Sequence, residues 1–218
     1  MEEEYLTACM LKRFELLFAI VGGWFVSILF LIVLRLKRGK TFPKGAVFIE
    51  NEKPYESYKS GYNLFLLIGM GLISFLNFFV VFLCIFNYWD SVSRYIAFDF
   101  PKLLNWIGII GIWIQDGWGV AVFSYNVNYT PAYKSMKSNY VLATGGPYKY
   151  IRHPMYTAKA VLVIFFFLAT GIWLALLGTL SWLGLTSQAK MEEEALMNKF
   201  GQRHTEYVNK TGRFFPKR

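Results

Sequence analysis

Long apolar runs separated by polar segments are the main pattern along this chain. Three runs, 14–34, 62–86 and 104–124, each have the length of roughly 20 residues that a helix needs to cross a bilayer core. A fourth stretch, 157–187, contains a single charged residue, Lys159 near its start, and is too long for one straight span. We predict that it forms a helical hairpin around Gly171. The pattern therefore predicts an all-α integral membrane protein with about five transmembrane helices.

The residues after the hairpin predict one more helix. Segment 191–200 is rich in residues of high helix propensity, and Gly201 suits the C-terminal end of a helix. We expect this short helix to continue from the last span into the cytosol. The chain then divides into residues 1–124, with three spans and their loops, and residues 125–218, with the hairpin, the C-terminal helix and most of the reactive side chains.

The composition also favours a membrane protein. The chain is 55% hydrophobic and only 17% charged, against about 25% charged residues in soluble domains. Basic residues concentrate in segments 35–61 and 125–156 and in the C-terminal tail, as in cytoplasmic loops of membrane proteins. This distribution explains the net charge of +9 without a nucleic-acid partner. Two cysteines predict no disulfide framework, and no metal-ligand spacing is present.

Segment 145–156 concentrates rigid and polar residues between two apolar runs. It contains two glycines, two prolines, three tyrosines, a lysine, an arginine and one of only two histidines. Pro154 can occupy the first turn of the following helix, where free backbone N–H groups favour a carboxylate or phosphate. Arg152 adds a planar fork suited to a carboxylate, and the tyrosines offer flat faces for an adenine ring or a cation. We expect this segment to form one wall of a pocket.

The C-terminal helix is predicted to form the opposite wall. Glu192 and Glu193 come shortly after the last span, and their carboxylates can accept hydrogen bonds from a ribose diol or an ammonium group. Because the hairpin returns the chain to the same side of the membrane, both clusters can face one pocket.

Asp116 stands apart, inside the third apolar run. It is a second functional candidate, although a hydrogen bond to a neighbouring helix would also explain it.

Taken together, these residues resemble a known family. The chain carries the run Gly146-Pro-Tyr-Lys-Tyr-Ile-Arg-His-Pro-Met-Tyr156, the pair Glu192-Glu193, then Phe200-Gly201, and the ending Tyr207…Lys210-Thr-Gly-Arg-Phe-Phe-Pro216. This pattern is similar to the isoprenylcysteine carboxyl methyltransferases and their phospholipid methyltransferase relatives, and it is closest to small prokaryotic members. The resemblance covers about residues 125–218. It implies a multi-pass membrane enzyme that binds S-adenosyl-L-methionine on the cytoplasmic side.

The resemblance also implies roles for individual residues. Eight are expected to bind the cofactor: Gly146, Pro147, Tyr148, His153, Pro154, Tyr156, Glu192 and Glu193. Arg152 and Glu193 are expected to be catalytic, and the substrate is expected to contact Arg152, Asn128 and Tyr207. Arg152 would hold the acceptor carboxylate or order the pocket that does. Two positions depart from the family pattern, because Ala158 replaces a common glycine and His204 replaces a usual tyrosine.

The expected reaction is methyl transfer to the carboxylate of a lipid-modified, isoprenylcysteine-like acceptor that enters from the lipid bilayer. The sulfonium donor is already activated, so the protein must mainly align the reacting atoms and exclude water. A phospholipid amine is an alternative acceptor, which would require a base such as His153 or a glutamate. A sterol-type membrane reductase that uses NADPH, and a non-enzymatic scaffold or transporter subunit built around Asp116, are further alternatives. The sequence does not indicate an oligomeric state.

Overall fold

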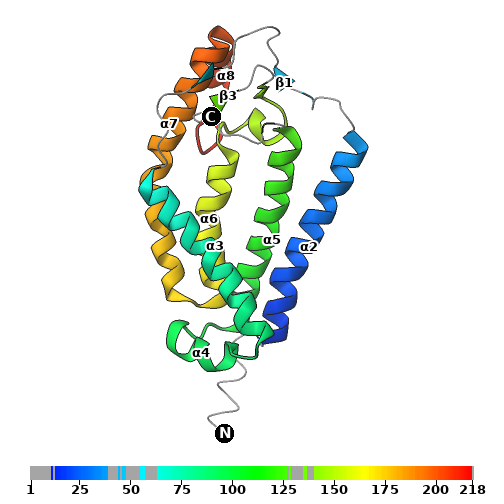
Figure 1. Ribbon diagram of the computed structural model, residues 1–218, viewed down its shortest axis with the longest axis vertical. Helices are drawn as coiled ribbons and strands as arrows, with labels where there is room; N and C mark the ends of the chain where they lie inside the picture. Colours follow the sequence, from blue (N-terminus) through cyan, green and yellow to red (C-terminus); the bar gives the residue numbers. More distant parts are fainter. Residues whose placement is uncertain are drawn as a thin grey trace. The chain divides into compact units, whose positions relative to one another are not determined.

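The computed structural model describes residues 11, 13–38, 44, 46–47, 55–56, 63–126, 128, 135–136 and 140–217. Over this part the chain is all-α, as predicted, apart from two small two-stranded sheets, β1 with β4 and β2 with β3 (Figure 1). The elements in chain order are α2 (Arg13–Arg38), β1 (Ala46–Val47), β2 (Tyr55–Glu56), α3 (Leu64–Ile85), α4 (Trp89–Ile96), α5 (Lys102–Tyr125), β3 (Ser135–Met136), β4 (Leu142–Ala143), η1 (Gly146–Lys149), α6 (Pro154–Thr170), η2 (Trp173–Thr179), α7 (Leu180–Phe200) and α8 (Gln202–Lys210).

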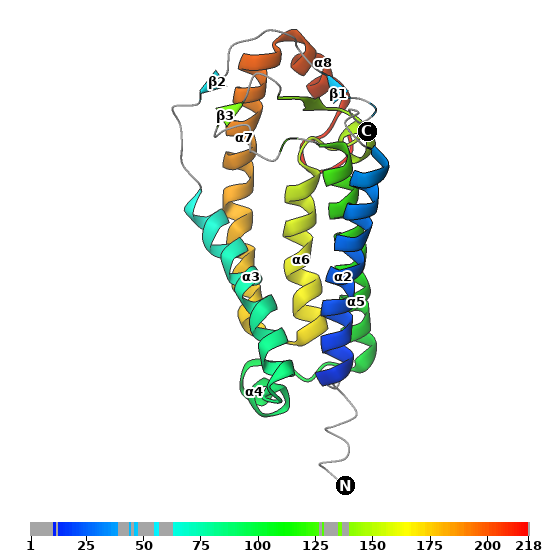
Figure 2. The same ribbon diagram turned by 45° about the vertical axis from the view of Figure 1, so that its right-hand side comes forward.

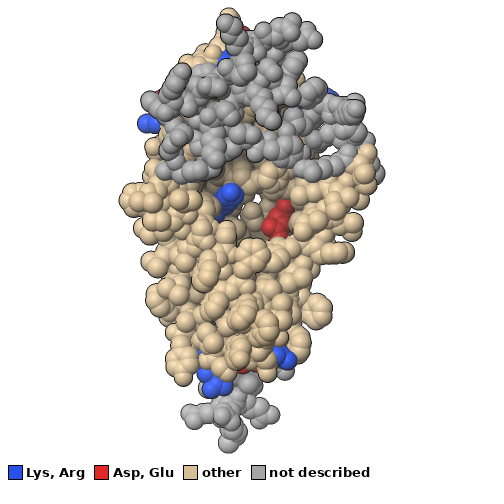
Figure 3. All heavy atoms as spheres, in the orientation of Figure 1, with Lys and Arg blue, Asp and Glu red and all other residues tan. Residues whose placement is uncertain are grey.

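Three of these helices, α2, α3 and α5, are long and apolar enough to cross a membrane. They correspond to the three apolar runs in the first part of the sequence. Helix α6 is also apolar but has 17 residues, and α7 is apolar in its first half and charged in its second. Most large side chains exposed on these helices are hydrophobic, and Figure 3 shows few charged groups among them. Such a surface suits contact with lipid rather than water.

Helices α6 and α7 form the predicted hairpin, and Gly171 lies at its turn. Gly171 has a φ of 71°, and its carbonyl oxygen accepts a hydrogen bond of 2.9 Å from the amide of Phe98. A Cβ atom on Gly171 would lie 2.2 Å from the carbonyl oxygen of Phe98, so only glycine fits. The indole of Trp182 on α7 donates to the carbonyl of Ala160 on α6 over 3.2 Å. The 3-10 segment η2, which separates the turn from α7, was not predicted from the sequence.

The chain divides into two compact units, and the first contains most of the apolar helices. Unit 1 comprises Met1–Phe30, Phe65–Gly117 and Ala158–Leu183. Its core is a cluster of buried apolar side chains that includes Leu16, Leu76, Ile109 and Phe166. The helices of this unit approach closely at glycine. A Cβ atom on Gly108 of α5, for example, would lie 2.2 Å from the backbone nitrogen of Ala169 on α6. Small residues of this kind allow apolar helices to pack without a gap.

Unit 2 contains the predicted site. It comprises Leu31–Leu64, Trp118–Thr157 and Gly184–Arg218, so the three basic segments of the sequence belong to one unit. Most of segment 35–61 lies outside the described residues. The predicted helix at 191–200 is the second half of α7, which ends at Phe200. A further helix, α8, follows Gly201, whose φ is 51° (Figure 2).

Candidate functional site

The turn at the start of the polar tract requires two adjacent glycines. Gly146 has a φ of 55° and opens the 3-10 segment η1. A Cβ atom on Gly146 would lie 2.3 Å from the ring of Tyr125, and one on Gly145 would lie 2.1 Å from the carbonyl oxygen of Lys44. Any larger residue would therefore displace backbone or a packed ring. The turn buries Pro147, which precedes the rest of the tract.

The backbone of the tract pairs with the C-terminal tail. Tyr150 accepts a hydrogen bond of 3.1 Å from the amide of Gly212, and the amide of Arg152 donates to the carbonyl of Gly212 over 2.8 Å. The amide of His153 donates to the carbonyl of Arg213 over 3.0 Å. These bonds form a short parallel bridge, which holds the tail residues beside the tract.

Helix α6 begins at Pro154, as predicted. The carbonyl of Pro154 accepts a hydrogen bond of 3.1 Å from the indole of Trp118 on α5. In the first turn, the amides of Tyr156 and Thr157 both contact the carbonyl of His153, at 3.1 and 3.2 Å. These two donors are therefore engaged within the protein. Fewer backbone donors are left at the helix start, where the sequence predicts an anion site.

Glu193 is the centre of a network of charged side chains. Its carboxylate accepts hydrogen bonds from Arg152 Nε at 2.9 Å and from Arg213 Nη2 at 2.7 Å, and it lies 3.2 Å from His153 Nε2. Burial disfavours the charge on Glu193, but these three cationic partners outweigh burial and hold the pKa of the carboxyl well below its usual range. Glu193 is therefore ionised at neutral pH.

His153 joins the two neighbouring glutamates. Its Nδ1 lies 3.2 Å from Glu192 Oε2, while its Nε2 faces Glu193. The hydroxyl of Tyr156 donates to Glu192 Oε1 over 2.8 Å, and its ring stacks on His153 at 5.4 Å. Burial alone would lower the pKa of His153, but the two carboxylates raise it above its ordinary value. Because a carboxylate can only accept, contact at both ring nitrogens favours the doubly protonated imidazolium.

Arg152 is engaged within the protein on two sides. Its Nε contacts Glu193, and its Nη1 donates to the carbonyl oxygens of Val208, at 3.2 Å, and of Thr211. The hydroxyl of Thr211 in turn donates to the carbonyl of Tyr207 over 2.7 Å. The guanidinium thus fixes α7, the end of α8 and the tail against one another. These contacts are compatible with the ordering role given as one alternative for Arg152, and both of its alternative roles stay predictions.

The two remaining substrate candidates also bond to the backbone. Asn128 donates to the carbonyl of Val141 over 2.6 Å and accepts from the amide of the same residue at 3.0 Å. The buried hydroxyl of Tyr207 donates to the carbonyl of Tyr148 over 2.7 Å. The hydroxyl of Tyr148 accepts from Asn126 Nδ2 at 3.0 Å. Burial raises the pKa of Tyr148 to about 12, so it stays a neutral phenol.

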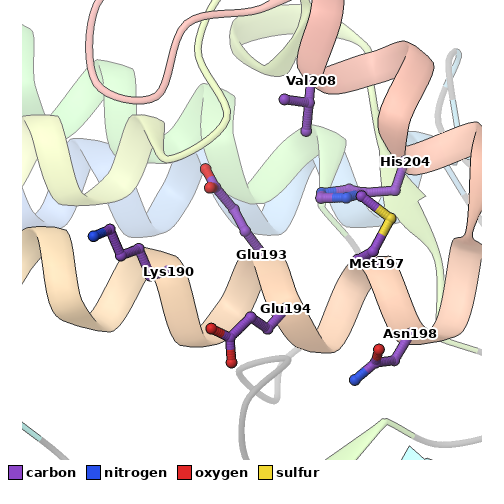
Figure 4. Close-up of a pocket in the computed structure, with 7 residues that line it drawn as sticks. All are labelled: Lys190, Glu193, Glu194, Met197, Asn198, His204 and Val208. Carbon is purple, nitrogen blue, oxygen red and sulfur yellow. The ribbon is translucent and has the colours of Figure 1, made fainter.

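A pocket of about 530 Å³ opens beside this network, on one face of α7 below α8 (Figure 4). Its volume falls in the range of small-ligand sites. Glu193 is part of both the charged network and the pocket wall. The residues that line the pocket are Lys190, Glu193, Glu194, Met197, Asn198, His204 and Val208.

Sequence reasoning missed two features of this site. Arg213 receives no individual role from the sequence, where it is one basic residue of the family-like ending, although it contacts both oxygens of Glu193. His204 was noted only as a departure from a family pattern, although it lines the pocket and is 1% exposed. Tyr150, which was expected to offer a flat face to a ligand, is 55% exposed, and the ammonium of Lys149 lies over its ring. The sequence did contain one signal for His204. Tyr207 and Val208 follow it at spacings of three and four residues, which place the three side chains on one face of α8.

Residues 104–203 match the family model of phospholipid methyltransferases. The match covers just under half of the chain and contains the polar tract and the glutamate pair, and it ends one residue before His204. It supports the broader assignment of this region to the membrane methyltransferases and does not separate an isoprenylcysteine acceptor from a phospholipid. No individual curated protein matches the chain.

Proposed function

We propose that this protein is a membrane methyltransferase that uses S-adenosyl-L-methionine. The observation that carries the proposal is the bridge from His153 to both Glu192 and Glu193. It joins side chains 40 residues apart in the sequence, and these side chains are the ones that the family resemblance assigns to the cofactor. The match to phospholipid methyltransferases supports the same class of reaction.

The side chains around this bridge fit the charges of the methyl donor. The donor carries a cationic sulfonium, an ammonium and a carboxylate, and when bound it supplies the methyl group that is transferred. Glu193 is already paired with Arg152 and Arg213, so Glu192, one position before it on α7, is the carboxylate that we propose for the cationic groups. The side chain of Arg213 is 32% exposed beside Glu193, so its outer face is available for a carboxylate. Tyr156 offers a ring already held by Glu192 and His153.

The network would act mainly by positioning. Arg152 and Arg213 neutralise Glu193 and hold the tail, so the side chains around the donor are fixed before it binds. An enzyme gains most of its rate in such a reaction by aligning the acceptor, methyl carbon and sulfur. The apolar surface of the neighbouring helices would let a lipid-like acceptor approach without crossing water. We place the donor site on the cytoplasmic side, because basic residues concentrate in the segments of unit 2.

Two classes of acceptor are compatible with this site. The family resemblance of the sequence favours the carboxylate of an isoprenylcysteine-like lipid. That reaction needs no base, and the exposed edge of Arg213 would then contact the acceptor or the donor carboxylate. A phospholipid amine is the second candidate, which the family match favours by its description. An amine must lose a proton before it can attack, so it requires a neutral base in the site.

Calorimetric binding of S-adenosylhomocysteine to the detergent-purified protein tests the reaction class. We expect binding by the wild type, at least a tenfold loss in Glu193→Ala and in His153→Ala, and wild-type affinity in Glu206→Gln. Glu206 is exposed on α8 and bonds only to Gln202 in the part of the chain that the structure describes, so it is a matched control.

Each other outcome would assign the protein differently. Binding of NADPH without S-adenosylhomocysteine would indicate a membrane reductase. Binding of neither would leave a membrane protein with this fold and no methyl donor, as in the scaffold alternative. Equal affinity in all four proteins would place the cofactor away from the His153 bridge.

A further inference from the structure

His204 is a buried imidazole whose polar atoms have no partner in the described part of the protein. It lies in α8, three residues after the turn at Gly201, and is 1% exposed. Neither Nδ1 nor Nε2 has a hydrogen-bond partner among the described residues. A neutral imidazole carries one donor and one acceptor, and burying both without partners is unfavourable. Each such group in a folded protein calls for an explanation, and a catalytic role is one of them.

The ring of His204 faces the pocket beside Glu193. Figure 4 shows it extending from α8 toward the space above α7, where Glu193 points upward. Met197 and Val208 form the apolar part of the same wall. The pocket therefore combines a neutral hydrogen-bonding ring, carboxylates and an apolar surface.

Charged groups of both signs surround this pocket. Two carboxylates and one ammonium line it, and one of the carboxylates, Glu193, is paired with Arg152, Arg213 and His153. The titratable and charged groups that face His204 are Lys190, Glu193 and Glu194 from α7, Arg152 and His153 from the segment before α6, and Tyr207 from α8, whose ring centroid is 6.3 Å away.

We propose that His204 accepts the proton of an amine acceptor that binds in this pocket. The inference rests on the proposed methyltransferase function and names its acceptor as a primary or secondary amine. One ring nitrogen of His204 takes a proton from the ammonium and becomes an imidazolium. The freed lone pair of the amine forms the new N–C bond with the methyl group. The S–C bond of the sulfonium breaks, and its electron pair stays on sulfur as a thioether.

The other histidine of the chain cannot take this role. His153 contacts a carboxylate at each ring nitrogen, and these contacts raise its pKa, so it has no free lone pair. His204 has the opposite environment. Burial lowers its pKa, Glu193 opposes that shift, and Arg152 and His153 add to it. His204 is consequently neutral at pH 7 and able to accept a proton.

His204 also stands where the family pattern usually has a tyrosine. A phenol buried in the same place would be protonated at neutral pH and could donate a hydrogen bond but not accept this proton. The base would therefore be a feature of this chain rather than of every relative, and His204 would contribute to the choice of acceptor.

The test compares wild type with His204→Gln in nanodiscs that contain phosphatidylethanolamine. Methyl transfer is followed between pH 5 and 9, and S-adenosylhomocysteine binding is measured in parallel. We expect the wild-type rate to rise with pH through the pKa of His204. His204→Gln should lose about 100-fold or more of the rate at pH 7, without that rise, while its affinity for S-adenosylhomocysteine stays within twofold.

Histidine NMR on the wild type gives a second readout that does not depend on turnover. The chain has only two histidines, so ¹³C-labelled histidine gives two ring signals, which His204→Gln assigns. We expect the His204 signal to titrate below 6.5 and to shift when phosphatidylethanolamine replaces phosphatidylcholine in the nanodisc. The His153 signal should stay protonated at pH 7.

The failures of the two proposals are distinguishable. If the wild type does not bind S-adenosylhomocysteine, the methyltransferase function fails. If it binds but His204→Gln methylates the amine lipid at the wild-type rate, only the role of His204 is overturned. Methylation of N-acetyl-S-farnesylcysteine with no methylation of the amine lipid would overturn it as well. If the NMR titration shows that His204 is protonated at pH 7, the role of His204 as a base is overturned too.

Discussion

His153 Nε2 and Glu193 Oε1 lie 3.2 Å apart, although 40 residues separate them in the sequence. The contact joins the segment before α6 to the second half of α7. It also sets the charge of both groups, because a buried imidazolium and a buried carboxylate each stabilise the other's ionised form. Since these pKa shifts arise only in the folded protein, they connect the site to the pH dependence of stability.

The first prediction concerns that pH dependence. The pKa of His153 is raised above its ordinary value of 6.5, so its stabilising effect is complete below 6.5 and is lost as pH rises through the folded pKa. The pKa of Glu193 is lowered from 4.5, so its effect is present above 4.5 and is lost as pH falls through the folded pKa. The thermal midpoint should therefore be highest between 4.5 and 6.5.

His153→Gln isolates the histidine contribution, because glutamine can bond to both carboxylates but does not titrate. Differential scanning fluorimetry in detergent should show a fall in midpoint at alkaline pH for the wild type and little fall for the variant. If both proteins lose stability in parallel above pH 6.5, another group causes the dependence.

A second prediction concerns Glu193→Gln. The change removes the negative charge that faces Arg152, Arg213 and His153. Arg152 and Glu193 are only 10% and 14% exposed, so leaving the cation unpaired should cost about 3 kcal/mol. Arg213 is more exposed and should contribute little. Denaturant unfolding checks this value against Glu206→Gln on the exposed face of α8, which should change stability by less than about 0.5 kcal/mol. If Glu193→Gln also changes the free energy of unfolding by less than about 0.5 kcal/mol, the charged network does not stabilise the protein.

Much of the fold follows from the sequence because it depends on local patterns. Apolar run length located α2, α3 and α5, and Gly171 located the turn after α6. Local patterns could not locate α4, because it has only 8 residues and is polar on average. They also missed the separate helix α8, because Gly201 indicates where a helix ends and not that another begins.

Less of the site was predictable from the sequence, because local patterns do not reveal contacts between distant segments. The tract and the glutamate pair were identified by residue type and spacing, and the structure brings them together. The role of Arg213 depends on parallel pairing of Ile151 with Gly212, a contact between distant segments that no periodicity reveals. The burial of His204 likewise depends on how α8 packs, not on its own sequence.

A third prediction compares two glycines that share a positive φ. Gly146 has a φ of 55° and Gly201 one of 51°, so alanine should be strained at both, by about 1–3 kcal/mol. Only at Gly146 would the new Cβ collide with a neighbour, the ring of Tyr125 at 2.3 Å. No atom of the described residues lies within 4 Å of a Cβ at Gly201. Gly146→Ala should therefore lower stability more than Gly201→Ala, and it alone should weaken S-adenosylhomocysteine binding. Equal effects on both properties would mean that Tyr125 moves aside without consequence.

A fourth prediction concerns Arg152→Lys. Lysine keeps the charge that faces Glu193 but loses the planar fork that also reaches the carbonyls of Val208 and Thr211. We expect faster hydrogen exchange at the amides of Gly212 and His153, which pair the tail with the tract, and a loss in S-adenosylhomocysteine affinity of about tenfold or more, equivalent to roughly 1.4 kcal/mol. Arg94→Lys on α4 is the control and should change neither. Unchanged exchange in Arg152→Lys would show that charge alone, without the fork, orders the tail.

A fifth prediction separates the enzyme from the scaffold alternative. Asp116 lies within α5, and its Oδ2 is buried without a hydrogen-bond partner among the described residues. It faces Gly23 of α2, where a Cβ atom would lie 3.4 Å from that oxygen. An uncompensated carboxylate inside an apolar span is costly, so the isosteric Asp116→Asn should leave the thermal midpoint unchanged or raise it. If the site is the one built around Glu193, Asp116→Asn should also bind S-adenosylhomocysteine like the wild type, while Glu193→Ala does not. The opposite pattern would be a loss of the protein's cellular function in Asp116→Asn and none in Glu193→Ala. That result would locate the function in the apolar helices and favour a scaffold or transporter subunit.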